Sequence, residues 1–207
     1  MWIKRAVDIS GATVLLIATS PILLLALVLV RITMGKPLIF RQERAGYNER
    51  IFTLYKIRTM LSEVDASGSP IPIGRRLTPI GRMIRHLSID ELPQLWNVLR
   101  GDMSLVGPRP LLASYLPRYS DFQKLRHQMK PGITGYAQVA GRDALTWEQK
   151  FNLDVFYVLH WSLSLDFRIV IHTVWTVLSA KNTAETGLPG EAEFMGVQSI
   201  QEPSARS

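Results

Sequence analysis

The hydrophobic residues of this chain are concentrated near its start, where residues 9–30 form a run of 22 residues without a charge. At a rise of about 1.5 Å per residue, a straight helix of that length would just cross the ~30 Å hydrocarbon core of a bilayer. A cleaved signal peptide usually has a shorter apolar stretch of ~7–15 residues, and residues 31–36 make a poor cleavage site. The pattern therefore predicts a membrane-associated helix.

The middle of this run contains Ser20 and Pro21. Proline removes a backbone donor and crowds the preceding turn, and a serine hydroxyl can bond a freed carbonyl, so we expect a kink. Lys4 and Arg5 precede the run and Arg31 follows it, which favours both ends on the cytoplasmic face. A re-entrant helix satisfies both observations, and an ordinary spanning helix with a tolerated proline is the alternative.

After the apolar run, residues 37–40 and 51–56 have the composition of short strands, and residues 45–49 between them are rich in turn formers. This arrangement predicts a β-hairpin. Residues 61–74 combine glycine, proline and serine without periodicity, so we expect a mobile surface loop there.

Helical patterns and end signals mark the remaining elements, at residues 79–87, 93–100, 111–119, 146–161 and 167–180. Gly101 is placed to stop the second helix, and Asp166 is a candidate N-cap for the last. The last helix can align Phe167, Val170, Val174 and Trp175 on one face, together with residues 177–178. Such a face suits the headgroup layer or a core, and for any one residue we favour the core.

From residue 181 onward the chain is polar and interrupted by glycine and proline, so we expect a flexible tail. Its apolar residues 194–197 could fold back onto the domain. Together these patterns predict an α+β fold that is mostly helical.

The charge is unevenly distributed. The formal net charge is +7, and residues 36–142 hold 17 Lys and Arg against 8 Asp and Glu. Of the 24 basic residues, 17 are arginine, the side chain best suited to two-point phosphate recognition. The excess therefore indicates either a polyanionic substrate or a solvated surface facing anionic lipids. The chain has no cysteine, which excludes disulfides, thiolate nucleophiles and cysteine-ligated metals.

The adjacent carboxylates Asp90 and Glu91 are the leading candidates for chemistry. Ser88 and Glu91 have the spacing of a helix capping box, which would give the pair a purely structural role. Pro93 disfavours that interpretation, because it would then lie inside the helix, whereas proline prefers the first turn. A helix starting near Pro93 leaves both carboxylates at its mouth, where Arg82 and Arg85 could attract a phosphate or its metal.

Two further segments could bind an anion. Pro108 and Pro110 restrict the backbone around Arg109, which suits either a preorganised contact or a simple loop staple. The glycine-containing turn at residues 131–135 leads to Arg142, which could close on phosphate. The four histidines have no ligand-like spacing, and neither a phosphate-binding lysine loop nor a dinucleotide fingerprint is present.

Taken in order, these segments resemble the monotopic bacterial phosphoglycosyl transferases. The resemblance covers roughly residues 1–180, and in length the chain is similar to the short PglC-type members. It rests on Lys4, Arg5 and Asp8, on Ser20 and Pro21, and on residues 40–44, 56–60, 87–110, 126–127, 130–138, 141–142 and 153–155. Departures from the commoner pattern are mild, namely Ile89, Tyr136 and residues 139–143.

The resemblance implies a monotopic membrane protein of the bacterial inner membrane, with its catalytic domain on the cytoplasmic face. Residues 1–35 would form a re-entrant helix-break-helix, in which Lys4, Arg5, Ser20 and Pro21 take part. Residues 36–180 would form the catalytic domain, with a β-hairpin and interfacial amphipathic helices, and residues 181–207 a polar tail.

The resemblance also implies transfer of a phosphosugar from a UDP-sugar to undecaprenyl phosphate, with Mg²⁺ and release of UMP. Asp90 would be the nucleophile of a ping-pong reaction, and Glu91 would bind the metal with Asp90 beside it. Phosphate and nucleotide contacts would come from Lys56, Arg58, Arg85, Pro108, Arg109, Pro110 and Arg142.

An N-acetylated sugar is the expected donor, and downstream glycosyltransferases or a second copy of the chain are candidate partners. Nucleic acid is not an expected partner of such an enzyme. The rival interpretation is a membrane-tethered protein that binds anionic lipid or nucleic acid without catalysis.

Overall fold

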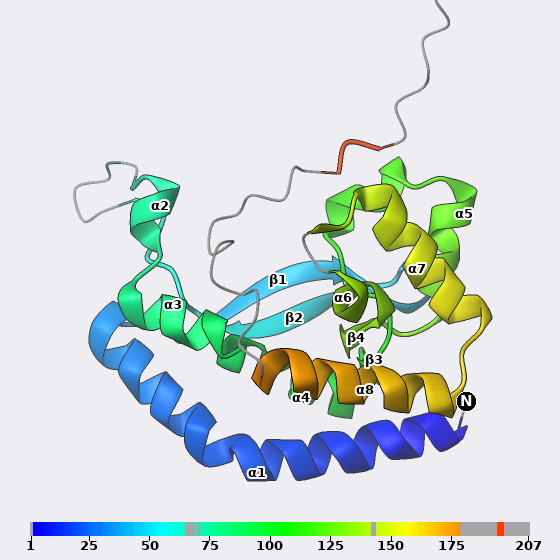
Figure 1. Cartoon of the computed structure of the whole chain (residues 1–207). Coiled ribbons are helices and arrows are strands. Elements are labelled where there is room, and N and C mark those ends of the chain that lie inside the picture. Colours follow the sequence, from blue (N-terminus) through cyan, green and yellow to red (C-terminus); the bar gives the residue numbers. More distant parts are fainter. Residues whose placement is uncertain (1, 65–68, 70, 142–143, 179–193, 197–207) are drawn as a thin grey trace, which may run out of the picture.

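A computed structural model describes residues 2–64, 69, 71–141, 144–178 and 194–196. Helices surround a small antiparallel hairpin, and one long helix runs along the base of the domain (Figure 1). The elements in chain order are α1 Trp2–Met34, β1 Ile39–Ala45, η1 Tyr47–Glu49, β2 Ile51–Ile57, α2 Ile73–Arg76, α3 Pro79–His86, η2 Ile89–Glu91, α4 Gln94–Arg100, β3 Ser104–Val106, η3 Ala113–Arg118, α5 Asp121–Lys124, η4 Leu125–Gln128, β4 Gly132–Thr134, α6 Tyr136–Ala140, α7 Trp147–Leu159 and α8 Leu163–Leu178, where η denotes a 3-10 helix.

The helix α1 is continuous over 33 residues and bends near its middle, where it contains Pro21 (Figure 1). The missing proline donor leaves the carbonyl of Ile17 without its usual partner, and the Ser20 hydroxyl bonds this oxygen at 2.7 Å. The expected kink is therefore present as a bend within one helix rather than as a break. Within the described residues, α1 is the helix long and apolar enough to cross a membrane.

Buried polar contacts fasten the first half of α1 to the domain. The Asp8 carboxylate accepts hydrogen bonds from the Ser104 hydroxyl at 2.9 Å and from the Leu105 amide at 3.0 Å. Lys4 forms an ion pair of 2.6 Å with Asp166 of α8. These bonds satisfy the polar side chains of an otherwise apolar helix, so they fix its position on the domain.

Two arginines bind the exposed carbonyls at helix ends. Arg5 donates to the carbonyls of residues 98 and 99, the last turn of α4, at 2.6 and 2.9 Å. Arg58 donates to the carbonyls of residues 34–36 at the end of α1. A cation at the carbonyl end of a helix is favourable because that end carries partial negative charge.

The second half of α1 is held by apolar packing. Ala26 and Val30 form a buried cluster with Ile57 of β2 and Ile84 of α3. Both halves of α1 therefore lie against the same domain, while most of its remaining apolar side chains point outward.

The predicted hairpin is confirmed, with a first strand longer than expected. β1 and β2 pair in antiparallel register from Ile39 opposite Ile57 to Ala45 opposite Ile51. Side chains alternate between the two faces of a strand and directly opposed residues share a face, so Arg44, Leu54 and Lys56 lie on one face.

The predicted helices at residues 79–87, 93–100 and 146–161 are confirmed as α3, α4 and α7. Gly101 ends α4 in the left-handed conformation, with φ 94°. The segment at residues 111–119 contains a 3-10 helix, η3, which includes Pro117. Within residues 61–74, the helix α2 begins at Ile73, and residues 65–68 and 70 lie outside the described part.

The expected cap of the last helix was wrong. α8 begins at Leu163, and the Ser162 hydroxyl accepts the Leu165 amide at 3.2 Å. Asp166 lies inside the first turn, where its carboxylate accepts the Tyr157 hydroxyl at 2.7 Å. Asp166 does not cap the helix because its carboxylate binds Lys4 of α1 and Tyr157 of α7 instead.

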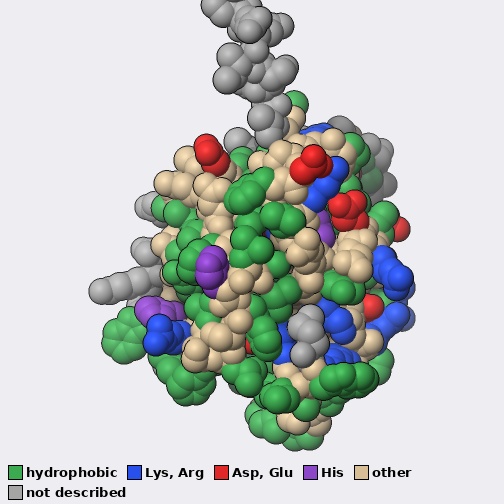
Figure 2. Space-filling model, turned by 90° about the vertical axis from the view of Figure 1, so that its right-hand side faces the viewer, with side chains coloured by type: hydrophobic (Ala, Val, Ile, Leu, Met, Phe, Trp, Pro, Cys, Tyr) green, Lys and Arg blue, Asp and Glu red, His purple; other side chains and the backbone are tan. Residues whose placement is uncertain are grey.

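The expected burial of the α8 face was also wrong. Phe167 is 67% exposed and Trp175 is 71% exposed, and Val170 and Val174 are exposed as well. Hydrophobic side chains gather along the lower edge of the molecule, the side on which α1 and α8 lie, while acidic side chains lie above them (Figure 2). This apolar edge fits the second alternative from the sequence, a helix in the headgroup layer.

The expected return of the tail is confirmed for Phe194. Its side chain is buried among the rings of Tyr115, Tyr119, Trp147 and Phe151, with ring centroids between 4.9 and 5.7 Å from its own. Residues 179–193 and 197–207 of the expected tail lie outside the described part of the chain.

Replacing Asp8 with alanine would remove the acceptor for two donors at the interface between α1 and β3. We expect the free energy of unfolding to fall by about 2 kcal/mol or more, since each buried donor left without a partner costs ~1–3 kcal/mol. Thermal unfolding in detergent, followed by circular dichroism, measures the change. The control Asp121→Ala removes a fully exposed carboxylate and should leave the melting temperature nearly unchanged. Equal melting temperatures for Asp8→Ala and the parent would contradict the assigned contact.

Candidate active site

The backbone places Asp90 and Glu91 in a short 3-10 turn, η2, between α3 and α4. Ser88 adopts the left-handed conformation, with φ 55° and ψ 20°, and its side chain makes no capping bond to the turn that follows. The capping-box interpretation is therefore excluded. Pro93 stands at the start of α4, as the sequence predicted. The two carboxylates are free of a capping role and available for chemistry.

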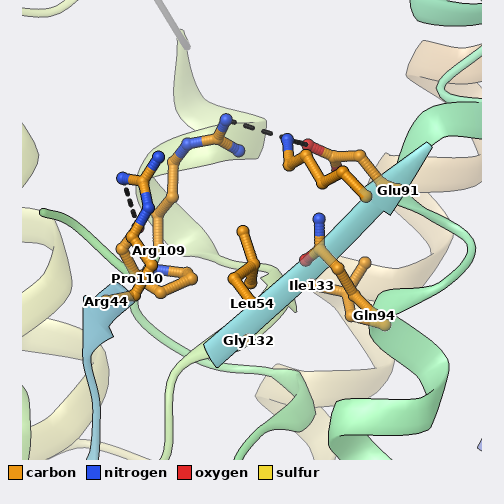
Figure 3. Close-up of a pocket in the computed structure, with 9 residues that line it drawn as sticks. Arg44, Leu54, Glu91, Gln94, Arg109, Pro110, Gly132 and Ile133 are labelled. Carbon is orange, nitrogen blue, oxygen red and sulfur yellow. Dashed lines mark hydrogen bonds and ion pairs between the residues drawn. The ribbon is translucent and has the colours of Figure 1, made fainter. Parts of the chain in front are cut away.

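Three cations surround the carboxylates. Lys56 Nζ lies 2.7 Å from Glu91 Oε1 and 4.0 Å from Asp90 Oδ2. Arg109 reaches toward Glu91 across the pocket, with its Nη2 3.8 Å from the same oxygen (Figure 3). Arg85 acts on Asp90 electrostatically, and its Nε donates to Thr59 Oγ1 at 2.7 Å. Their positions bring β2, α3 and the segment after β3 together around η2.

Asp90 is the more buried carboxylate, with its side chain 11% exposed. Burial raises the pKa of the Asp90 carboxyl to about 6, and the charge of Glu91 adds to the rise while Lys56 and Arg85 oppose it. A carboxyl with this pKa is mainly ionised at neutral pH, but it is poorly solvated. Its oxygen is consequently a stronger nucleophile than that of a solvated carboxylate.

Glu91 lines a pocket on the face of the hairpin that carries Arg44, Leu54 and Lys56 (Figure 3), and Asp90 precedes it in the chain. Glu91 lies at one end of this pocket, with Lys56 Nζ 2.7 Å from its carboxylate, and Arg44 and Pro110 lie at the other end. The residues that line it are Arg44, Leu54, Lys56, Glu91, Gln94, Arg109, Pro110, Gly132 and Ile133.

Parallel pairing of β3 with β4 brings the two predicted loop segments together. The Gly132 amide donates to the Pro108 carbonyl at 3.0 Å. A Cβ atom on Gly132 would lie 2.1 Å from the Gly107 nitrogen, so only glycine permits this approach. The turn at residues 131–135 therefore forms a wall of the same pocket as Arg109.

The acidic pair has the composition of a magnesium site that is completed by substrate. The described residues contain no group of three or more His, Cys, Asp and Glu side chains that could hold a metal. Mg²⁺ is commonly held by one or two carboxylates together with substrate phosphates and water, so two adjacent carboxylates fit this ion. Asp90 and Glu91 are the residues that would hold it.

The remaining predicted site residues do not all lie at the pocket. Pro108 and Pro110 are buried, and Arg109 between them is exposed toward the pocket. Arg58 donates to the carbonyls at the end of α1, and its predicted phosphate contact stays a prediction. Arg142 lies outside the described residues.

Sequence reasoning missed two polar residues of the pocket, Arg44 and Gln94. Arg44 had a detectable signal, because it shares a hairpin face with Lys56 once the register is known. Gln94 follows Pro93 in the first turn of α4 and carried no separate signal.

Comparison with known proteins identifies the family of this chain. The sequence model of the bacterial sugar transferase family matches residues 1–180. The chain therefore belongs to the bacterial sugar transferase family.

Three relatives illustrate the range of this family. The chain is 51% identical to the uncharacterized sugar transferase EpsL of Bacillus subtilis, over 95% of this chain and 97% of the relative. It is 39% identical to the UDP-glucose:undecaprenyl-phosphate glucose-1-phosphate transferase of Caulobacter vibrioides, over 86% of this chain and 71% of the relative. It is 38% identical to the UDP-N-acetylgalactosamine-undecaprenyl-phosphate N-acetylgalactosaminephosphotransferase of Aeromonas hydrophila, over 86% of this chain and 44% of the relative.

The raised pKa of Asp90 predicts that Asp90→Asn stabilises the metal-free protein in a pH-dependent way. The folded-state pKa of about 6 exceeds the unfolded value of about 3.9, so ionisation of Asp90 destabilises the fold as the pH rises from 4 to 6. Asparagine does not ionise. The melting temperature of Asp90→Asn minus that of the parent should therefore grow by a few degrees between pH 4 and pH 7, measured with chelator present.

The matched control is Asp121→Asn, at an exposed position, for which the same difference should stay flat across the pH range. A difference for Asp90→Asn that is constant with pH would show that Asp90 has an ordinary pKa.

Proposed function

We propose that this protein transfers a phosphosugar from a UDP-sugar to undecaprenyl phosphate, giving undecaprenyl-diphospho-sugar and UMP. The observation that carries the proposal is the buried Asp90 beside Glu91 and Lys56, two residues that line a pocket together with Arg44 and Arg109. Membership of the bacterial sugar transferase family supports the reaction class, and two relatives are named for this reaction with two different sugars.

The reaction proceeds in two displacements at the phosphorus that bears the sugar. In the first, an Asp90 carboxylate oxygen forms a bond to this phosphorus, and the bond to the UMP oxygen breaks. In the second, an oxygen of undecaprenyl phosphate attacks the same phosphorus, and the bond to Asp90 breaks. The carboxylate is restored, so the cycle is ping-pong and needs no other co-reactant.

Neighbouring cations lower the barrier by compensating charge that moves during these steps. Lys56 holds the Glu91 carboxylate at 2.7 Å and keeps the Asp90 oxygen in reach of the pocket. Arg109 and Arg85 add positive charge on the two sides of the acidic pair. Fixed charges of this kind stabilise a phosphoryl transition state without reorganisation. Arg142 is proposed to contribute a further phosphate contact.

Magnesium is the proposed cofactor, held by Asp90 and Glu91. When bound, this ion supplies charge neutralisation to the diphosphate of the donor. Lys56 Nζ and Arg109 Nη2 lie 2.7 and 3.8 Å from Glu91 Oε1, so positive charge already stands beside the carboxylate that would bind the ion.

The membrane arrangement is proposed to be re-entrant. Both halves of α1 pack on one domain, through Asp8 and Lys4 at one end and through Val30 at the other. A helix whose two ends touch the same domain keeps both ends on one side of the bilayer. The apolar edge formed by α1 and α8 would then lie in the cytoplasmic leaflet of the bacterial inner membrane, which sets the pocket at the height of a lipid phosphate (Figure 2).

The donor sugar is proposed to be N-acetylated, and the product to start a lipid-linked glycan. Downstream glycosyltransferases would extend that product, and a second copy of the chain is a candidate partner. The relatives named here use glucose and N-acetylgalactosamine, so a panel of UDP-sugars is needed to assign the donor.

Turnover tests the proposed reaction directly. With Mg²⁺ and the matching UDP-sugar, the protein should release UMP continuously when undecaprenyl phosphate is present, and at most one UMP per enzyme without it. Asp90→Asn should reduce the rate by at least about a thousandfold, because the nucleophile is lost. Mass spectrometry of enzyme incubated without lipid should find the phosphosugar on residue 90.

Three outcomes would contradict the proposal. Continuous UMP release without lipid would indicate a hydrolase, and the absence of release with every donor would favour a protein that binds anionic lipid or nucleic acid. Full activity of Asp90→Asn would exclude Asp90 as nucleophile. Asp121→Asn provides the control, with unchanged activity expected at an exposed carboxylate.

Cysteine labelling tests the re-entrant arrangement, since the natural chain contains no cysteine. Trp2→Cys and Lys36→Cys place one thiol at each end of α1. Both should react with a membrane-impermeant maleimide only when the cytoplasmic face is accessible, as in inverted vesicles. Asp121→Cys reports the side on which the catalytic domain lies. Labelling of Trp2→Cys from the opposite side would establish a spanning helix.

A further inference from the structure

Arg44 is the charged lining residue of the pocket to which the mechanism above assigns no role. It projects from β1 on the face of the hairpin that also carries Leu54 and Lys56, and all three line the pocket. It lies at the end of the pocket opposite Glu91 (Figure 3).

The charge of Arg44 is only partly compensated by the described residues. Its terminal nitrogens donate to the Gln42 side chain at 2.5 Å and to the Pro110 carbonyl at 3.3 Å, and both acceptors are neutral. Its Nε is buried without a partner among the described residues. A guanidinium has five N–H donors, so donors remain after these bonds. No ion pair joins Arg44 to a carboxylate within the described part of the chain.

Arg109 increases this excess of positive charge. Burial and the nearby charge of Arg109 lower the pKa of Arg44 to about 10, while Tyr115, Tyr119 and Glu91 oppose this change. Two guanidinium groups that share a pocket repel each other until an anion lies between them. A phosphate suits this position because its oxygens can accept from both planar groups.

We propose that Arg44, together with Arg109, forms a binding subsite for a phosphate monoester in the part of the pocket between their two guanidinium groups. The identity of the ligand rests on the proposed function. UMP leaves as a phosphate monoester in the first displacement, and undecaprenyl phosphate attacks as a phosphate monoester in the second. Both groups must approach the same phosphorus on the side opposite Asp90, so one subsite serves both in turn.

UMP and undecaprenyl phosphate do not need to be bound at the same time. A ping-pong reaction vacates the leaving-group position before the second substrate enters it. Fixed arginines at that position stabilise the charge that develops on the departing UMP, and they later orient the lipid phosphate for attack.

Binding measurements on the full-length protein in detergent test the subsite without requiring turnover. Affinity for UMP is measured by titration calorimetry with Mg²⁺ present, for the parent, Arg44→Gln and Arg44→Lys. Arg44→Gln should weaken UMP binding at least tenfold, and Arg44→Lys should weaken it less, because lysine keeps the charge but loses the planar fork. Uridine, which has no phosphate, should bind the parent and Arg44→Gln equally.

A second measurement separates the two sources of the phosphate monoester. Enzyme carrying the phosphosugar adduct on Asp90 is mixed with undecaprenyl phosphate, and the loss of the adduct is followed by mass spectrometry. Weakening of both UMP binding and adduct discharge supports a shared subsite. Weakening of UMP binding alone restricts the subsite to the nucleotide, and slower discharge alone restricts it to the lipid; either result overturns the shared use.

The matched control is Arg41→Gln. Arg41 lies on the same strand but on the opposite face of the hairpin, over the ring of Tyr55, so its loss should change neither measurement. Equal UMP affinity and equal discharge for Arg44→Gln and the parent would overturn the proposal. Equal weakening of uridine and UMP would do so as well, because it would show that Arg44 only holds Pro110 in place. An inactive parent that nevertheless binds UMP through Arg44 would refute the proposed reaction and leave the nucleotide subsite standing.

Discussion

The contact between Lys56 and the acidic pair is the interaction on which the site depends. It joins the hairpin to the short turn between α3 and α4, and it places a cation 2.7 Å from Glu91 and 4.0 Å from Asp90. Two adjacent carboxylates in a partly buried turn repel each other and are poorly solvated, so they need such a partner. The same contact aligns Arg44 and Leu54 with the pocket, because the strand register fixes which residues share the face of Lys56.

A second constraint comes from α1, which determines where this site stands. Its charged residues Lys4, Arg5 and Asp8 find partners on the domain, and most of its large apolar residues are exposed. The helix is thus an integral wall of the domain as well as an anchor. Because the bend at Pro21 keeps both halves against one body, the chemistry is held at a fixed distance from the apolar edge.

Local signals in the sequence were sufficient for much of the fold. The stop at Gly101, the hairpin turn and the bend at Ser20 and Pro21 depend on neighbouring residues, and each was predicted. Asp90 and Glu91 could be selected as candidate site residues because Pro93 made a helix capping role for them unfavourable. Contacts between distant segments could not be found in this way. Asp166 binds Lys4, Arg58 binds the end of α1, and Arg44 enters the pocket only through the strand register.

The return of Phe194 has a practical consequence for experiments on this family. The match to the family ends at residue 180, yet a residue beyond that limit fills an aromatic cluster with Tyr115 and Leu111. Leu111 directly follows Pro110, a lining residue of the pocket. A protein truncated at residue 180 would lack Phe194 and would expose the rings of Tyr115, Tyr119, Trp147 and Phe151. The packing next to Leu111 and Pro110 would be weakened. The intact folded domain therefore extends beyond the part of the chain that the family model matches.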